Sequence, residues 1–163
     1  MDYRNHAAPD RGCRPTQGVE VPIRFEWTRQ PKVGPSLHIL GDLLGRTVVE
    51  LGCGSGHNLA HLAVYQGVIG VGVDHDPAKI CRAYARYGHI PNICFVLADC
   101  NEYLRSISPR SVDIFLSIFG AFSFADPLTL LVGTKNALRS DGLLALTLRA
   151  DDQHDLVVLL RRS

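Results

Sequence analysis

The stretch Val48–Asn58, VVELGCGSGHN, places three glycines at alternate positions directly after a run of strand-forming residues. Valine and leucine favour a buried strand, and glycine allows backbone conformations that other residues rarely adopt. Such glycines fit either a tight turn between a strand and a helix or a loop whose backbone approaches a ligand. Three of them in this position favour the binding loop.

The spacing of the glycines separates two classes of cofactor. A dinucleotide-binding loop needs the pattern G-x-G-x-x-G, in which the diphosphate rests on the helix N-terminus. Here His57 occupies the third glycine position, and Glu50 places a carboxylate beside the loop. A carboxylate repels a diphosphate and attracts an ammonium group. An NAD-dependent dehydrogenase is therefore the disfavoured alternative.

Outside this stretch, apolar runs alternate with amphipathic segments. Runs that are apolar on both faces are typical of parallel strands covered by helices. We expect strands at residues 47–53, 68–74, 93–99, 112–119 and 143–149, and helices near residues 56–66, 76–87 and 126–139. The alternation predicts an α/β fold with a doubly wound, mostly parallel sheet, whose ligand binds beyond the carboxyl ends of the strands.

The first 35 residues are expected to lie outside this sheet. Residues 1–18 lack periodicity and predict a mobile tail. Residues 19–35 contain three prolines and predict a covering segment, in which Trp27 either closes over the site or packs as an anchor. Residues 36–44 predict a short helix. The expected division is a tail and cover, residues 1–35, and one cofactor-binding domain, residues 36–163.

The composition of the 163-residue chain disfavours several partners. A net charge of +1 gives no electrostatic reason to expect nucleic acid or an anionic membrane. No segment fits a membrane span or a signal peptide, which predicts a cytoplasmic protein. Five cysteines without a C-x-x-C pair predict reduced, mostly buried thiols. His57 and His61 share a helix face, but no third ligand is in evidence, so no metal site is expected.

Five stretches resemble, in order, the motifs of the class I S-adenosylmethionine-dependent methyltransferases, over roughly residues 36–150. VVELGCGSG resembles the family's first motif, and VIGVGVDHDPAKI resembles its second strand and helix. ICFVLADC, VDIFLSIFGAFSFAD and LRSDGLLALTL resemble the third, fourth and fifth strands with their loops. The resemblance implies a Rossmann-like sheet with strand order 3-2-1-4-5, S-adenosyl-L-methionine as cofactor, and methyl transfer to a small-molecule acceptor.

The resemblance also implies where the cofactor lies. Glu50 is placed near the methionine amino group, and Asp74 offers two acceptor oxygens to the ribose hydroxyls. His75 could cover the adenine, and Asp99 faces the adenine amino group. The full set of implied contacts is Glu50, Gly52, Cys53, Gly54, Gly56, Asp74, His75, Asp99, Cys100 and Ser117. Each aspartate alone also fits a solvated strand end or a helix cap.

The acceptor side is less defined. Phe119 and Phe122 follow the fourth strand, where the resemblance implies contact with the transferring methyl, and both also fit core packing. The motifs of the DNA-methylating branches, Asn/Asp-Pro-Pro-aromatic and Pro-Cys, do not occur there. His57 and His154 are weak candidates for a general base. For His154 the alternative is a solvated position before a last helix capped by Asp152.

Only DLVVLLRRS follows the turn after the fifth strand. Family members usually continue with a helix and two more strands, so the resemblance implies a sheet that lacks them. An uncovered fifth strand would be a strongly apolar edge, which proteins avoid. We therefore expect either that a partner, such as a second copy, covers this edge or that the chain is a truncated product. The alternative function is a truncated or non-catalytic cofactor-binding domain.

Overall fold

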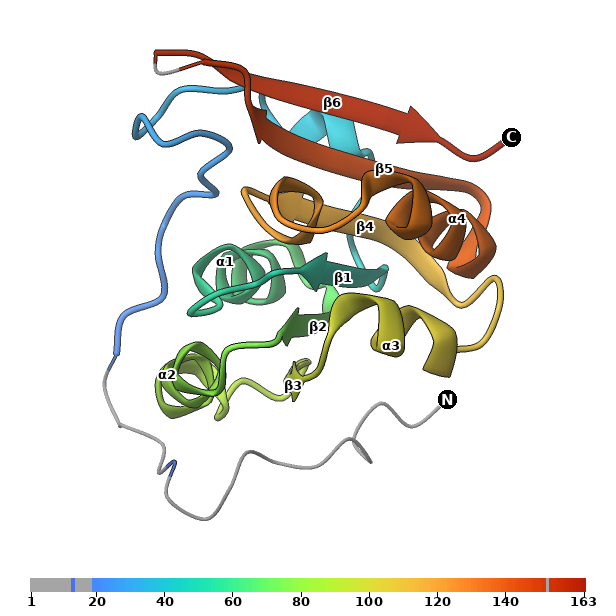
Figure 1. Ribbon diagram of the computed structural model, residues 1–163. Coiled ribbons are helices and arrows are strands. Elements are labelled where there is room, and N and C mark those ends of the chain that lie inside the picture. The colour runs from blue at the N-terminus through green and yellow to red at the C-terminus, as the bar shows by residue number, and fades with distance from the viewer. Residues whose placement is uncertain (1–12, 14–18, 152) are drawn as a thin grey trace.

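The computed structural model describes residue 13, residues 19–151 and residues 153–163. Six strands form one sheet in the order β3-β2-β1-β4-β5-β6 (Figure 1). The strands are β1 (Thr47–Leu51), β2 (Ile69–Asp74), β3 (Ile93–Leu97), β4 (Val112–Ile118), β5 (Leu138–Arg149) and β6 (Asp155–Arg161). The first five are parallel, and β6 is antiparallel to β5. The expected Rossmann-like fold with strand order 3-2-1-4-5 is confirmed.

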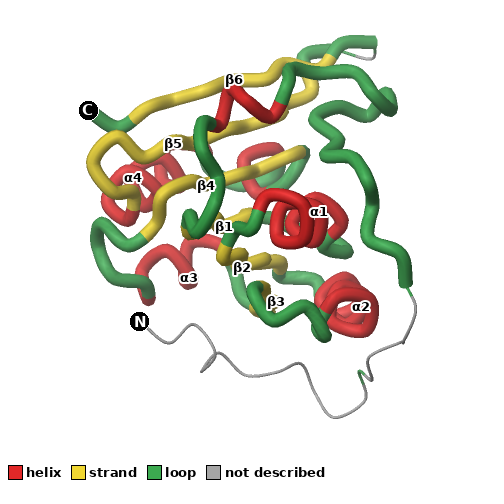
Figure 2. Tube along the Cα trace, turned by 180° about the vertical axis from the view of Figure 1, so that it is seen from behind, coloured by secondary structure: helices red, strands yellow, loops and turns green. Residues whose placement is uncertain are grey.

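Helices cover both faces of the sheet (Figures 1 and 2). On one face, α1 (His57–Gln66) and α2 (Pro77–Tyr87) contribute to the hydrophobic core. On the other face, α3 (Cys100–Ser106) and α4 (Pro127–Ala137) do so. Every residue of β1 is buried because β1 lies between β2 and β4 and beneath both helix layers. The glycine loop after β1 therefore opens at the middle of the edge where such sheets bind ligands.

Three helices begin at an aspartate that caps them. Asp76 accepts from Ala78 N and Lys79 N at the start of α2, and Asp126 accepts from Thr129 N at the start of α4. Asp99 does the same for α3, a helix of seven residues that the sequence did not predict. Such a cap satisfies backbone N–H groups that have no partner within the helix. Cys100 is the first residue of α3.

The C-terminal segment differs most from the expectation. DLVVLLR forms β6, whose residues pair with Leu143–Arg149 of β5, and not a last helix. The expectation that the sheet lacks both final strands is wrong for this one, and β6 covers the β5 edge that was expected to need a partner. Asp152, expected as the helix cap, lies outside the described residues.

Other boundaries shift by a few residues. β5 begins at Leu138 because that residue pairs with Val112 before an irregularity in the β4–β5 ladder. The helix expected at residues 36–44 is a single 3-10 turn, η2 (Leu37–Leu40), capped by Ser36. It ends at Gly41, whose φ of 80° cannot continue the helix.

The N-terminal segment runs along the carboxyl ends of the parallel strands, as the blue trace in Figure 1 shows. The backbone of Glu26 exchanges two hydrogen bonds with the Asn58 side chain in α1, at 3.0 and 2.9 Å. His61 Nδ1 lies 2.9 Å from the carbonyl oxygen of Pro22. Trp27 is 2% exposed and packs in the core, so it is an anchor. The tail expected at residues 1–18 lies outside the described residues, apart from Cys13.

The expectation of five reduced thiols is wrong for two of them. Cys13 and Cys81 form a disulfide that joins the N-terminal region to α2 across 68 residues of sequence. The other three, Cys53, Cys94 and Cys100, are free thiols. The sequence gave no sign that Cys13 and Cys81 meet, because they are far apart in the chain and only the packed fold brings them together.

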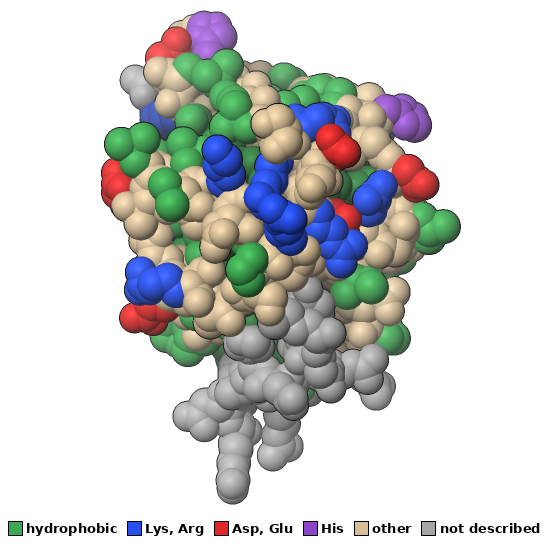
Figure 3. Space-filling model, turned by 90° about the vertical axis from the view of Figure 1, so that its right-hand side faces the viewer, with side chains coloured by type: hydrophobic (Ala, Val, Ile, Leu, Met, Phe, Trp, Pro, Cys, Tyr) green, Lys and Arg blue, Asp and Glu red, His purple; other side chains and the backbone are tan. Residues whose placement is uncertain are grey.

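At the opposite edge, where the parallel strands begin, Lys and Arg side chains gather (Figure 3). Arg46 and Arg139 both pair with Asp113 Oδ1, at 3.1 and 3.5 Å. Arg162 Nη1 donates to the carbonyl oxygen of Leu138 just beyond α4. These arginines stabilise the edge of the sheet that lies opposite the glycine loop.

No helix within the described residues is long and apolar enough to cross a membrane.

Candidate functional site

The glycine loop between β1 and α1 is held by the end of β2. The N–H groups of Gly52 and Cys53 both donate to the carbonyl oxygen of Val73, at 2.8 and 3.0 Å. Gly54 N donates to Asp74 Oδ2 at 2.9 Å. Asp74 Oδ1 in turn accepts from Asp76 N at 3.0 Å. Asp74 is 3% exposed, so this buried carboxylate fixes the loop on one side and the start of α2 on the other.

The three glycines have three different surroundings, although all have positive φ. A Cβ on Gly52 would lie 2.6 Å from Gly120 Cα, and one on Gly56 would lie 2.6 Å from the Phe95 ring. A Cβ on Gly54 would meet nothing within 4 Å. Gly52 and Gly56 are therefore needed for packing within the chain. Gly54 alone faces open space, so it is the residue at which a ligand could approach the backbone.

Glu50 is the most unusual side chain of the site. It is 3% exposed, and its Oε2 atom has no hydrogen-bond partner among the described residues. Burial and the nearby charge of Asp74 raise its pKa to about 8, although a backbone hydrogen bond from Leu59 in α1 acts in the opposite direction. A buried carboxylate with an unpaired oxygen is unfavourable unless a cation or a proton reaches it.

Two of the implied cofactor residues are buried thiols. Cys53 and Cys100 are 7% and 8% exposed. Burial, followed by the neighbouring Asp99 charge, raises the pKa of Cys100 to about 12. Burial, with the charges of Glu50 and Asp74, raises the pKa of Cys53 well above its usual value. Both side chains therefore stay protonated and act as small apolar groups beneath the loop.

Asp99 and His75 lie at the rim of the same edge. Asp99 Oδ1 accepts from the N–H groups of Asn101 and Glu102, at 2.9 and 3.2 Å, as the cap of α3. The His75 side chain is 80% exposed, with Nδ1 3.8 Å from Asp74 Oδ1. The structure thus brings Glu50, Asp74, His75 and Asp99 to the carboxyl ends of β1, β2 and β3, as the sequence predicts.

Ser117 supports the loop after β4. It is fully buried, and its Oγ accepts from Phe122 N at 3.4 Å. That loop contains Gly120, which packs against Gly52, and Phe119, whose φ is 49°. Positive φ is rare for an aromatic residue and marks a backbone held in place by its surroundings. Phe122 is buried in the core, whereas Phe119 is partly exposed at the strand end.

His57 is bound to α2. Its Nδ1 lies 2.8 Å from the Tyr87 hydroxyl, and Arg86 Nη1 lies 3.0 Å from its Nε2. Because arginine can only donate, Nε2 is the acceptor and Nδ1 carries the proton toward Tyr87. Burial, followed by the Arg86 charge, lowers the pKa of His57 and favours this neutral form. Both ring nitrogens are occupied, so His57 is a poor general base.

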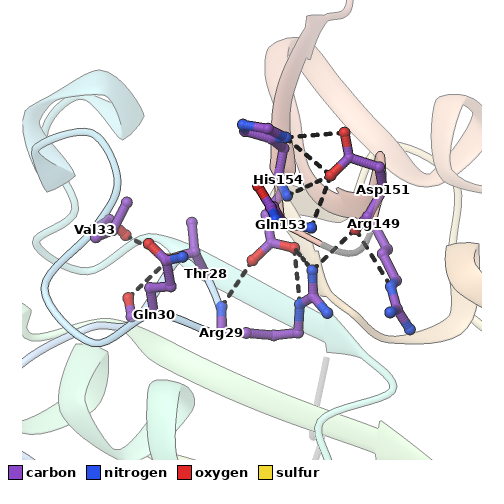
Figure 4. Close-up of polar contacts among 9 residues, drawn as sticks. Thr28, Arg29, Gln30, Val33, Arg149, Asp151, Gln153 and His154 are labelled. Atoms are coloured by element: carbon purple, nitrogen blue, oxygen red, sulfur yellow. Dashed lines mark hydrogen bonds and ion pairs between the residues drawn. The ribbon is translucent and has the colours of Figure 1, made fainter.

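The other candidate base, His154, belongs to a polar cluster at the turn between β5 and β6 (Figure 4). His154 Nδ1 lies 2.9 Å from the carboxylate of Asp151. Arg29, from the N-terminal segment, pairs with Asp155 at 2.7 Å and donates to the Asp151 carbonyl oxygen at 3.2 Å. Its guanidinium lies 5.9 Å from the centre of the Phe119 ring.

The sequence did not predict the roles of Arg29 and Asp155. They are 126 positions apart, and neither belongs to a local motif. Their pairing joins the N-terminal segment to β6 across the end of β4. Among the described residues, no group of three or more His, Cys, Asp or Glu side chains could hold a metal ion.

Comparison with known proteins identifies the family to which the chain is similar. Residues 48–142 match the family model described as "Methyltransferase domain". No curated protein sequence matches the chain.

Among solved structures, a phosphoethanolamine N-methyltransferase 2 from Haemonchus contortus is similar, with a TM-score of 0.62 and 22% identity over 69% of this chain. Geranyl diphosphate C-methyltransferase from Streptomyces coelicolor has a TM-score of 0.59 and 16% identity over 67% of this chain. A chain of the Haloferax volcanii complex that contains the Trm112 methyltransferase activator has a TM-score of 0.58 and 28% identity over 68% of this chain. The chain covers 26%, 40% and 50% of these three proteins.

Proposed function

The chain belongs to the methyltransferase domain family, and on this premise we propose that it binds S-adenosyl-L-methionine and transfers its methyl group to a small-molecule acceptor. The observation that carries the proposal is Glu50, whose buried Oε2 lacks a partner within the described residues. The ammonium group of the methionine part would supply the missing cation, whereas the diphosphate of a dinucleotide would be repelled.

The loop beside Glu50 fits the rest of this cofactor. Gly54 presents backbone without an obstructing neighbour. Each oxygen of Asp74 accepts one backbone N–H and keeps a second lone pair for a ribose hydroxyl. Asp99 and His75 lie beyond Asp74 at the rim, where the adenine would follow. Cys53, Cys100 and Ser117 form the floor of this region, and Gly52 and Gly56 fix the loop that Gly54 exposes.

The bound sulfonium supplies an activated methyl group, so the chain's part is to orient an acceptor and to exclude water. Arg29 and Phe119 close the side of the site above β4. Where the acceptor must lose a proton, we propose His154 as the base. The Asp151 carboxylate can only accept, so it fixes the proton on Nδ1 and leaves Nε2 to receive another.

Titration calorimetry with S-adenosylmethionine tests the proposal. We expect wild-type protein to bind, and Asp74→Asn to bind at least about tenfold more weakly because an amide offers one acceptor oxygen instead of two. Asp126→Asn is the matched control, since Asp126 also caps a helix but belongs to α4 and bonds to Thr129, not to the glycine loop. A folded wild-type protein that gives no heat with S-adenosylmethionine, or that prefers NAD, would refute the proposal.

A non-catalytic cofactor-binding domain is the second candidate. The side chain of His154 is 73% exposed, so the proposed base lies in solvent and not in an enclosed pocket. Methyl transfer is measured by mass spectrometry with amine, thiol and hydroxyl acceptors. Binding of S-adenosylmethionine without turnover on any of them would favour this candidate.

A further inference from the structure

The outer edge of β6 is the feature of the molecule that most needs a partner. β6 is the last strand of the sheet in the described part of the chain. Proteins usually protect such an edge with proline, lysine, a bulge or a covering segment. β6 contains neither proline nor lysine, and Leu156, Leu159 and Leu160 are 52%, 41% and 43% exposed.

The pairing with β5 decides which backbone groups of β6 point outward. Arg162 N donates to Gly142 O, and Ala150 N donates to His154 O, so these pairs are hydrogen-bonded pairs of the antiparallel ladder. Such pairs alternate with non-hydrogen-bonded pairs along the register. The even-numbered residues of β6 therefore bond to β5. The N–H and C=O groups of Asp155, Val157, Leu159 and Arg161 point away from it.

We propose that β6 pairs edge to edge with β6 of a second copy of this chain, antiparallel and two-fold symmetric about Val158. In this register Asp155 faces the partner's Arg161, and Val157 faces the partner's Leu159. All four outward residues of each copy then form hydrogen-bonded pairs. The sequence DLVVLLR is self-complementary in this arrangement: opposite charges at the ends and apolar residues between them.

The remaining side chains also find partners. Leu156 faces the partner's Leu160, and Val158 faces the partner's Val158, in non-hydrogen-bonded pairs where side chains come closest. Leu160 lines a hollow of about 250 Å³ together with Leu131 of α4 and Leu144 of β5. The partner's Leu156 would lie at the mouth of this hollow, and every exposed leucine of β6 would gain an apolar neighbour.

The charges of Asp155 and Arg161 favour this register over registers shifted by two residues. A slip of two residues in either direction keeps outward groups opposite one another but separates Asp155 from the partner's Arg161. Asp155 already pairs with Arg29 and its side chain is 5% exposed, but a second arginine on one buried carboxylate has a precedent within this chain. The Asp113 side chain, 8% exposed, pairs with both Arg46 and Arg139. A two-fold arrangement also closes after two copies, whereas a head-to-tail arrangement would continue.

Sedimentation velocity across a roughly hundredfold range of concentration measures the association. We expect wild-type dimers in the micromolar range, because a strand edge alone is a small interface. Leu156→Lys should raise the dimer dissociation constant by at least about tenfold, since each interface would then bury two lysines. Leu128→Lys is the matched control: Leu128 is 71% exposed, lies on α4, and should leave the dimer unchanged.

Cross-linking tests the register. Val158→Cys should form a disulfide between copies under mild oxidation, because a non-hydrogen-bonded pair has Cα atoms about 4.5 Å apart. Leu159→Cys should not, since its counterparts are offset by two positions and lie beyond disulfide reach. A wild-type protein that stays monomeric, a ladder of higher oligomers, or a dimer that neither Leu156→Lys nor Val158→Cys affects would overturn the proposal. Cofactor titration of Leu156→Lys should match wild type, which separates this result from the proposed function.

Discussion

The Glu50 carboxylate should lower the stability of the cofactor-free (empty) protein and favour binding of S-adenosylmethionine in the cofactor-bound (loaded) protein. Its pKa is about 8 in the folded chain and 4.5 without burial, so the folded state holds a proton that the unfolded state releases between these values. Stability should therefore fall as pH rises from 4.5 to 8, by up to about 1.4 kcal/mol per pH unit. In the loaded protein, the ionised carboxylate would instead pair with the cofactor's ammonium group.

Glu50→Gln should separate these effects. The amide needs no proton, so the free energy of unfolding of the empty variant should exceed that of wild type by about 4 kcal/mol at pH 8 and by less than about 1 kcal/mol at pH 5. Urea unfolding at both pH values measures this difference. Affinity for S-adenosylmethionine should decrease in the same variant. Parallel pH profiles for the two proteins would show that Glu50 is not the group that carries the buried proton.

Gly52 and Gly54 should respond differently to alanine. Gly52→Ala should lower the free energy of unfolding by roughly 2–4 kcal/mol, because its Cβ meets the backbone of Gly120 in addition to the positive φ. Gly54→Ala should cost only about 1 kcal/mol, since no atom obstructs it. Cofactor affinity of Gly54→Ala should nevertheless drop at least about tenfold. Equal affinity of Gly54→Ala and wild type would mean that the ligand does not approach this loop.

On the scale of elements, α3 depends on its cap because it is only seven residues long. Asp99→Ala should cost about 1 kcal/mol and speed hydrogen exchange at Asn101 and Glu102. Asp99→Asn should keep the cap, since its amide oxygen also accepts. Loss of cofactor affinity in Asp99→Asn at unchanged exchange rates would support the adenine contact. Unchanged affinity in both variants would leave Asp99 as a cap alone.

The elements also show what the sequence can predict. The five parallel strands, β1 to β5, were found from their apolar runs, because burial on both faces leaves a strong pattern. β6 has a similar apolar run, but this run also fits a helix. It forms a strand because it pairs with the open edge of β5. α3 is too short for helical periodicity to appear. The strand pattern put Glu50 and Asp74 near the carboxyl ends of β1 and β2, where they lie in the structure. The separate surroundings of the three glycines depend on contacts with Gly120 and Phe95 that no local pattern encodes.

At the scale of the whole molecule, the disulfide ties Cys13 to Cys81 of α2. A cross-link that spans 68 residues lowers the entropy of the unfolded chain and should stabilise the fold by up to about 4 kcal/mol. Thermal unfolding with and without a reductant measures this contribution. The reductant should have no effect on Cys13→Ser, and an equal shift in that variant would trace the change to another thiol.

The ion pair between Arg29 and Asp155 joins the beginning of the described chain to its end. During synthesis the central strands and their helices emerge long before Asp155 does. Until that residue leaves the ribosome, the N-terminal segment lacks the contact that holds it across β4. The closure of the edge that carries the candidate site is therefore a late event in the biogenesis of this chain, and a nascent chain that stops short of β6 would keep that edge open.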